Sequence, residues 1–136
     1  MKKLFVLAVL ALALPSVALA KPPATHTNKS HAAPKVMYIL KGPLSNYIPA
    51  TSTTEGSISI TVKHTNYHGR ALKDQTLTFT VASNTRVVNG TAPLGPNARG
   101  MVKFKAPLRF PSGTNLVTTL PTMAKAFHVI VQNSGN

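Results

Sequence analysis

Residues 57–81 read SISITVKHTNYHGRALKDQTLTFTV, and the two ends of this stretch decide the fold. In residues 57–62 isoleucine and valine alternate with serine and threonine, and residues 76–81 repeat the pattern with Leu77, Phe79 and Val81. A period of two puts the apolar side chains on one face and the hydroxyls on the other, which is typical of half-buried β-strands. Two such strands, joined by a polar loop that contains Gly69, are expected to form an antiparallel pair.

The rest of the chain repeats this alternation and shows no sustained helical period after residue 20. Residues 44–56 are expected to form a long surface loop, because Gly42-Pro43 ends the first strand and the stretch that follows lacks periodicity. Asn89-Gly90 is a strong turn signal. Residues 111–121 are interpreted as a loop, with a short strand at 116–120 as the alternative. Further strands are expected at residues 35–41, 85–88, 101–110 and 123–132. An all-β chain with irregular turn spacing predicts a small antiparallel barrel of five to six strands.

The first 20 residues have the layout of a secretory signal peptide. Lys2 and Lys3 precede an apolar run over residues 4–14, and residues 18–20 read ALA. A membrane-spanning helix needs about 20 apolar residues, so the run is too short for an anchor. The pattern predicts cleavage after Ala20 and a protein that is secreted, periplasmic or associated with the cell envelope, without an integral membrane segment after cleavage.

The expected domain organisation follows from this leader. Residues 21–34 contain three prolines and no apolar periodicity, so they are expected to form a disordered linker. Residues 35–133 form the predicted barrel domain, and residues 134–136 a disordered tail.

The chain is strongly basic, with 15 Lys and Arg residues against Glu55 and Asp74 alone, for a formal net charge of +13. The predicted leader contains two lysines, so the mature chain carries +11. Such a charge attracts polyanions: nucleic acid, acidic polysaccharide, teichoic-type polymers or anionic membrane surfaces. A charge that only keeps the domain soluble is the alternative. Cysteine is absent, which excludes disulfides and thiol chemistry.

One predicted strand carries most of the candidate polyanion-binding residues. Lys103, Lys105 and Arg109 are expected on one face of the strand at 101–110, with Arg99 just before it. A two-residue spacing sets successive charges about 7 Å apart, which can follow an anionic backbone. Basic residues that only discourage edge pairing are the alternative. Three loop residues are candidates for stacking against bases or sugars: Tyr47, Tyr67 and His68.

No catalytic, metal-binding or cofactor-binding residue is predicted. Glu55 and Asp74 fall in predicted loops, and the sequence contains no nucleophile-elbow motif. His64 and His68 have the four-residue spacing of a helical zinc site, but they are expected at a strand end and in a loop, where that geometry is lost. His128 is a third ligand that the pattern does not require. The sequence therefore favours a protein that is not an enzyme and has no cofactor.

The segment TLTFTVASNTRV (residues 76–87), followed by RGMVKFK (residues 99–105), resembles a pattern in exported bacterial domains of unknown function that have an OB-like β-barrel. The closing segment AKAFHV (residues 124–129) is also similar to that pattern. The longer Pro-rich loops, and the lack of an acidic residue beside the Gly-led strand, depart from it. The resemblance implies an OB-like barrel, and it brings no established activity or site residues.

The expected function is that of an exported, non-enzymatic barrel that associates with an anionic polymer through its basic strand face. The candidate polymers are a cell-wall or extracellular polysaccharide and a nucleic acid. A structural or protein-interaction module of the cell envelope is the alternative, and it predicts an exposed apolar patch around Tyr47, Ile48 and the strand end after Pro107. A weak hydrolase would need Glu55 or Asp74 beside a histidine in a pocket.

Overall fold

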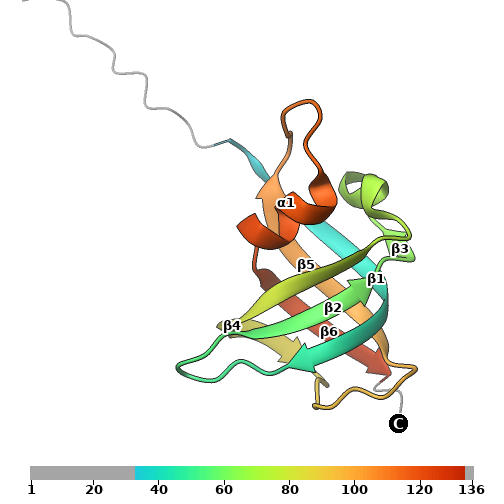
Figure 1. The fold of residues 1–136 in the computed structure, drawn as a ribbon, viewed down its shortest axis with the longest axis vertical. Helices are drawn as coiled ribbons and strands as arrows, with labels where there is room; N and C mark the ends of the chain where they lie inside the picture. The colour runs from blue at the N-terminus through green and yellow to red at the C-terminus, as the bar shows by residue number, and fades with distance from the viewer. Residues whose placement is uncertain (1–32, 134–136) are drawn as a thin grey trace, which may run out of the picture. The chain divides into compact units, whose positions relative to one another are not determined.

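The computed structural model describes residues 33–133. The predicted signal peptide, most of the predicted linker and the C-terminal tail lie outside this range. The elements follow one another as β1 (Lys35–Ile48), β2 (Gly56–Thr61), β3 (His64–Thr65), η1 (Tyr67–Leu72, a 3-10 helix), β4 (Thr76–Val88), β5 (Arg99–Pro107), α1 (Leu116–Met123) and β6 (Ala126–Asn133) (Figure 1).

Five strands close into a barrel in the order β1–β2–β4–β6–β5, with β5 returning to β1 (Figure 1). Neighbouring strands are antiparallel except β4 and β6, which run parallel. The short β3 pairs with Leu40 and Lys41 of β1, just before the part of β1 that pairs with β2. This arrangement confirms the predicted small OB-like barrel. No helix among residues 33–133 has the length and apolar character needed to cross a membrane.

The pair of strands predicted from residues 57–81 is β2 and β4, and it is antiparallel as expected. Ile58 lies opposite Phe79, and Ile60 lies opposite Leu77, with all four side chains buried in the barrel. The hydroxyls lie on the other face, where Ser59 bonds Thr78 at 2.7 Å and Thr61 bonds Thr76 at 2.9 Å. Cross-strand hydroxyl pairs of this kind add to the stability of the ladder.

Aromatic rings fill the centre of the barrel. Phe104 of β5 stacks on Tyr38 of β1 at a centroid distance of 5.0 Å and packs against Phe79 of β4 at 4.6 Å. Phe79 and Phe104 are fully buried, and Tyr38 is 3% exposed. Contacts of this kind between three strands stabilise the closed barrel beyond simple area burial.

β1 runs through Gly42-Pro43, so the prediction that it ends there was wrong. Gly42 lies against the backbone of Thr61, where a Cβ would collide, so the glycine permits the close approach of β1 to the strand beside it. A register shift follows between Ser45 and Ile48, and Asn46 has a φ of 50° there. Strongly coiled barrel strands use such bulges to bend. The loop that follows is confined to residues 49–55, which is shorter than predicted.

Two helical segments were not predicted from the sequence. η1 occupies residues interpreted as a loop, and α1 begins within the predicted loop at 111–121, where the alternative was a short strand at 116–120. The Asn115 side chain caps α1 by accepting a hydrogen bond from the Val117 N–H at 3.0 Å. Leu120 is fully buried, and α1 lies over one end of the barrel (Figure 1). With Pro121 inside it, α1 depends on this burial rather than on helix propensity.

Strict alternation in the strand expected at 123–132 would place Phe127 on the same face as Val129 and Val131, which are buried, but the structure departs from it. Ala126 and Val129 both face the core, whereas Phe127 is 56% exposed. The parallel pairing with β4 shifts register at this place, between the partners of Val81 and Arg86. Because the pairing is irregular here, the buried positions change from Ala126 to Val129, and Phe127 between them points outward.

Candidate functional site: a basic groove beside β3

Basic residues gather around β3, at the side of the barrel. Three adjoining hollows lie there, and His64 lines all three. We call the three hollows together the basic groove. Six basic residues line it: Lys41, Lys63, Arg70, Lys73, Arg99 and Lys103. The groove therefore collects cations from β1, β5, η1 and the turns that flank β3 and β4.

The largest hollow has a volume of about 660 Å³ and is lined by Lys41, Lys63, Lys73 and Arg99. Its acidic residue is Asp74, which accepts a hydrogen bond from the Lys63 Nζ at 3.0 Å. This hydrogen bond and the lysine charge lower the pKa of Asp74. The carboxylate therefore stays ionised and offsets a single cation, which leaves the hollow with an excess of positive charge.

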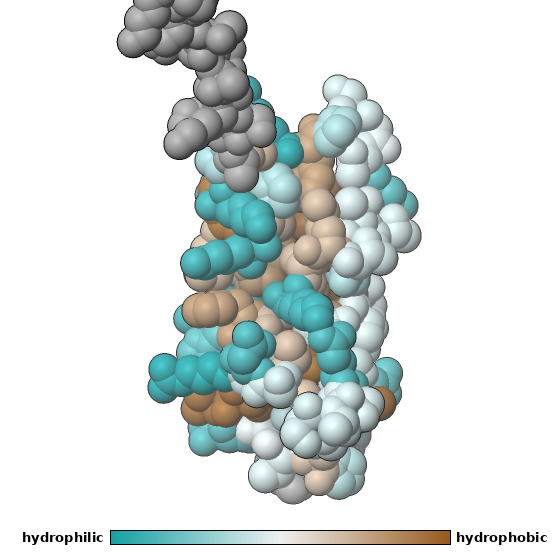
Figure 2. Space-filling view, turned by 90° about the vertical axis from the view of Figure 1, so that its left-hand side faces the viewer, coloured by the Kyte–Doolittle hydropathy of each residue, from teal (hydrophilic) through white to brown (hydrophobic). Residues whose placement is uncertain are grey.

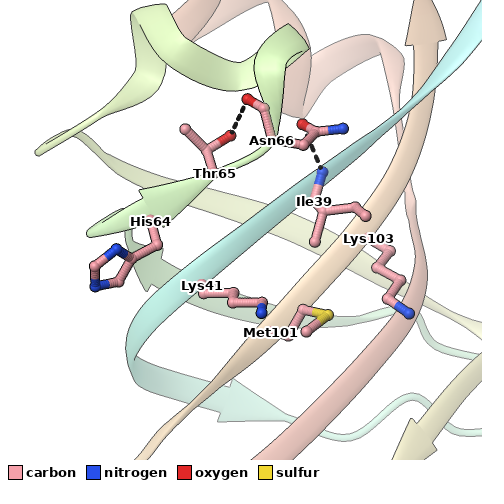
Figure 3. A pocket seen from close by; sticks show the side chains of 7 residues that line it. All are labelled: Ile39, Lys41, His64, Thr65, Asn66, Met101 and Lys103. Carbon is pink, nitrogen blue, oxygen red and sulfur yellow. Dashed lines mark hydrogen bonds between the residues drawn. The ribbon is translucent and has the colours of Figure 1, made fainter.

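Asn66 fixes the wall of the groove to β1. Its Oδ1 accepts a hydrogen bond from the Ile39 N–H at 3.3 Å (Figure 3), and its Nδ2 donates to the Met37 carbonyl at 2.8 Å. The Asn66 backbone N–H also donates to the Ile39 carbonyl at 3.2 Å. The side chain thus continues the β1–β3 ladder by one position, and it holds η1 and His64 at the side of the barrel.

The hollow next to Asn66, of about 320 Å³, combines charge with apolar surface. Ile39 lies opposite Lys103, and Lys41 lies opposite Met101, across the β1–β5 pair (Figure 3). Apolar and cationic side chains therefore alternate in both directions on this part of the sheet. A ligand in this hollow would contact the apolar side chains of Ile39 and Met101 as well as the ammonium groups of Lys41 and Lys103.

The four predicted polyanion-binding residues do not act as one cluster. Arg99 and Lys103 line the groove, in hollows that share Lys41 and His64. Lys105 lies on the outer face of β5, outside the groove, with its Nζ 5.5 Å from the centre of the Phe127 ring. Arg109 is not on the strand, because β5 ends at Pro107; it lines a separate hollow beside Ala33 and Pro34. The prediction that Lys103, Lys105 and Arg109 share one strand face was therefore wrong for Arg109.

Sequence reasoning missed four of the basic residues that line the groove: Lys41, Lys63, Arg70 and Lys73. Lys41 and Lys63 lie 22 positions apart in the sequence, and the Lys63 N–H donates to the Lys41 carbonyl at 2.9 Å. The pairing of β1 with β3 brings these two lysines together, and no local pattern in the sequence predicts that pairing. Lys73 precedes Asp74, whose positive φ of 62° turns the chain towards β4.

Tyr67 and His68, predicted to stack against bases or sugars, lie together on η1. Their rings meet edge to face at 5.7 Å, and the Arg70 guanidinium lies 4.5 Å from the centre of the Tyr67 ring. A hollow of about 320 Å³ adjoins these residues, and Tyr67 is 71% exposed. Tyr47 is not part of this group, because it is half-buried on β1 and packs against the core.

His128 lies between two cations on the outer face of the sheet. It is opposite Lys103 on β5 and opposite Arg86 on β4. Its Nε2 is buried and has no hydrogen-bond partner. Burial, followed by the charges of Lys103 and Arg86, lowers the pKa of His128. The imidazole is therefore neutral at neutral pH.

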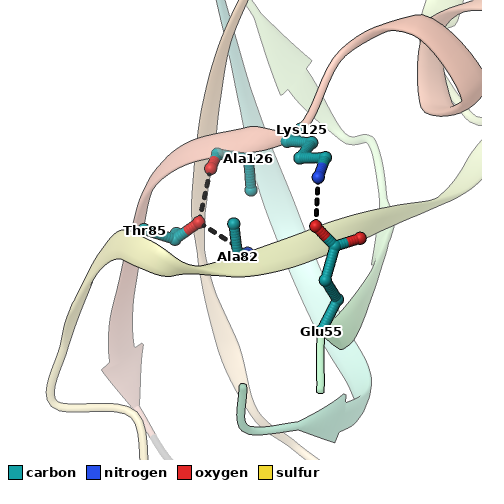
Figure 4. Close-up of polar contacts among 5 residues, drawn as sticks. All are labelled: Glu55, Ala82, Thr85, Lys125 and Ala126. Atoms are coloured by element: carbon teal, nitrogen blue, oxygen red, sulfur yellow. Dashed lines mark hydrogen bonds and ion pairs between the residues drawn. The ribbon is translucent and has the colours of Figure 1, made fainter. Parts of the chain in front are cut away.

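Glu55 and Asp74 are each paired with a lysine and are not placed beside a histidine partner for acid–base chemistry. Asp74 and His64 line the same hollow, but within residues 33–133 no hydrogen bond joins their side chains, and Asp74 bonds Lys63 instead. Glu55 pairs with Lys125, away from the groove (Figure 4). Among the described residues, no group of three His, Cys, Asp or Glu side chains is placed to hold a metal ion.

The exposed apolar residues predicted by the protein-interaction alternative are only partly present. Ile48 is 60% exposed and Leu108 is 42% exposed, whereas Tyr47 is half-buried. Leu108 follows the end of β5 and Ile48 ends β1.

Comparison with known proteins adds no relative. No protein-family model matches the chain, and no curated protein and no solved structure was found to be similar to it. The resemblance to exported barrel domains therefore stays a prediction, and the residues of the groove have to carry the functional argument.

Proposed function

We propose that the protein is an exported, non-enzymatic barrel that binds an anionic polymer in the basic groove and along the adjoining face of β5. The observation that carries the proposal is the largest hollow of the groove, which is lined by Lys41, Lys63, Lys73 and Arg99 and by a single carboxylate that is already bonded to Lys63. Cations gathered in one concave surface raise the local concentration of anions and strengthen their binding.

The arrangement of the three hollows favours an extended ligand over a small one. The hollows adjoin through His64, and their cations extend from Lys103 on β5 to Arg70 on η1. A polymer with repeated negative charges meets several of these cations at once, and each contact releases counterions. An acidic polysaccharide, a teichoic-type polymer and a single-stranded nucleic acid all have this property.

The positions of the acids support binding rather than catalysis. The chain has two acidic residues, and each forms an ion pair with a lysine: Asp74 with Lys63 and Glu55 with Lys125. A general acid or base has to be free to exchange protons with a substrate. The proposed export rests on the sequence of residues 1–20.

A titration at rising salt tests the proposal, with the polymers heparin, teichoic acid and single-stranded DNA. The double variant Lys63→Ala/Lys73→Ala removes two cations of the groove. The matched control Lys35→Ala/Lys125→Ala removes two exposed cations outside it. If both groove lysines contact the polymer, the slope of log K against log salt falls by about 1.4–1.8 for the groove variant.

The control variant is expected to keep most of the slope. Equal losses in the two variants would show that only the diffuse charge of the chain attracts the polymer. Binding that does not change with salt, or no binding by the unaltered protein, would contradict the proposal.

A further inference from the structure

The outer face of the sheet formed by β1, β5, β6 and β4 mixes cations with apolar side chains in a way that polymer binding does not require. Met101 lies between Lys41 on β1 and Ile130 on β6, and Val88 of β4 continues this line across the sheet. In the next line Lys103 lies between Ile39 and His128. Every one of these apolar side chains is partly exposed. We call this surface the amphipathic face.

Phe127 makes the apolar character of the face strongest near the start of β6. It is 56% exposed, and the Lys105 Nζ lies 5.5 Å from the centre of its ring. Met37 and Ile39 on β1, the strand that pairs with β5, are partly exposed and extend the apolar surface. In Figure 2 hydrophilic side chains in teal project beside residues in brown on the left of the view, whereas the right of the view is mostly pale.

The charge of the amphipathic face has one sign. Lys41, Lys103, Lys105 and Arg86 project from it, and neither acid of the chain lies on one of its strands. Glu55 precedes β2 and pairs with Lys125, and Asp74 precedes β4 and pairs with Lys63. An occupant of this face therefore has to be anionic, and it also has to accept exposed methionine, isoleucine and phenylalanine side chains.

A hydrated polysaccharide or nucleic-acid backbone satisfies the charge requirement but leaves the apolar side chains in water. An anionic bilayer surface satisfies both requirements, because it has phosphates at the depth that lysine side chains reach and hydrocarbon just below. We propose that the amphipathic face docks the barrel onto a membrane surface rich in anionic phospholipid, with Phe127 and Met101 entering the boundary between headgroups and acyl chains. The amphipathic face shares Lys41, Met101 and Lys103 with the basic groove but does not include Lys63 and Lys73, so variants at these two lysines distinguish membrane docking from polymer binding.

The experiment uses vesicles of phosphatidylcholine alone and vesicles that also contain phosphatidylglycerol. All proteins are full-length, so the apolar residues 4–14 contribute equally to every variant, and differences between variants report on the barrel. The face variant is Phe127→Ser/Met101→Ser. The matched control is Ile48→Ser/Met123→Ser, which removes two exposed apolar side chains from elsewhere on the barrel. Thermal melting confirms that each variant is folded.

The face variant is expected to bind phosphatidylglycerol vesicles about tenfold more weakly than the unaltered protein, while the control stays within about twofold. The groove variant Lys63→Ala/Lys73→Ala is expected to bind these vesicles within about twofold of the unaltered protein. Equal behaviour of the face and control variants would overturn the proposal. Loss of vesicle binding in the groove variant alone would overturn it as well, and would assign the lipid phosphates to the groove.

A second measurement locates the contact directly. The chain contains no tryptophan, so Phe127→Trp introduces a single fluorescent probe on the face, and Met123→Trp introduces one on α1. With phosphatidylglycerol vesicles, the emission of the probe at position 127 is expected to shift to shorter wavelength, while that of the probe at 123 stays unchanged. An unshifted probe at 127 would overturn the proposal, whatever the outcome of the polymer titration.

Discussion

Lys103 of β5 and His128 of β6 lie directly opposite each other on the outside of the barrel, and Arg86 of β4 flanks the histidine on its other side. The buried Nε2 of His128 has no hydrogen-bond partner. A protonated imidazole would be a third positive charge in this line, with no acid beside it. This geometry predicts that acid destabilises the folded state.

We predict that His128 makes the barrel less stable as the pH falls. Its pKa in the folded protein is lowered from 6.5, so the unfolded chain binds the proton first. The contribution of neutral His128 to the free energy of unfolding is fully present above pH 6.5, and it is lost progressively as the pH falls below that value. Thermal melts of His128→Gln between neutral pH and about pH 5 should show a smaller loss of Tm than the unaltered protein. The control His64→Gln, at an exposed position, should retain the loss. An identical pH dependence in the His128 variant would contradict the prediction.

Asp74 is predicted to weaken anion binding, because it places a negative charge in the basic groove and engages Lys63. Asp74→Asn removes the charge and frees the ammonium group, and asparagine tolerates the positive φ of this position. Affinity for heparin should rise several-fold at low salt. Glu55→Gln, which makes the same change outside the groove, should have a much smaller effect. If the two variants bind equally tightly, the groove has no special role.

Asn66 is predicted to hold the wall of the groove in place. Asn66→Ala leaves the Ile39 N–H and the Met37 carbonyl without their partners, which costs about 1–3 kcal/mol of unfolding free energy. Hydrogen exchange at the Ile39 amide should become faster, and polymer binding should weaken because η1 is no longer fixed. Asn84→Ala, at an exposed position, is the control. Unchanged exchange at Ile39 would show that the backbone pairing holds the wall without the side chain.

Thr85 is predicted to stabilise the irregular part of the β4–β6 pairing. Its Oγ1 accepts a hydrogen bond from the Ala82 N–H at 2.9 Å and donates to the Ala126 carbonyl at 2.7 Å (Figure 4). Thr85→Val keeps the shape but removes both bonds, and should cost about 1–3 kcal/mol in denaturant unfolding. Thr80→Val, on the hydroxyl face of β4, should cost less. Equal costs would show that the bridge across the bulge contributes nothing beyond an ordinary strand threonine.

Alternation in the sequence predicted the interior of the barrel because it is a local property. Strict period-two patterns at 57–62 and 76–81 place Ile58, Ile60, Leu77 and Phe79 inward wherever the strands pair, and the structure confirms all four. The pattern failed where backbone pairing is irregular. Phe127 points outward because the β4–β6 register shifts beside it, and α1 forms because Leu120 is buried against the end of the barrel.

By itself, the sequence determined that the domain at residues 35–133 is built mainly from strands with an apolar and a polar face, and that the chain carries a large positive charge with only two acids. Tertiary structure alone decided where that charge gathers. Lys41, Lys63 and Lys73 line one hollow because β3 pairs with β1, whereas Arg109 leaves the group because β5 ends before it. Strand faces follow from neighbouring residues, but a groove is made by segments that are distant along the chain and meet only when the barrel closes.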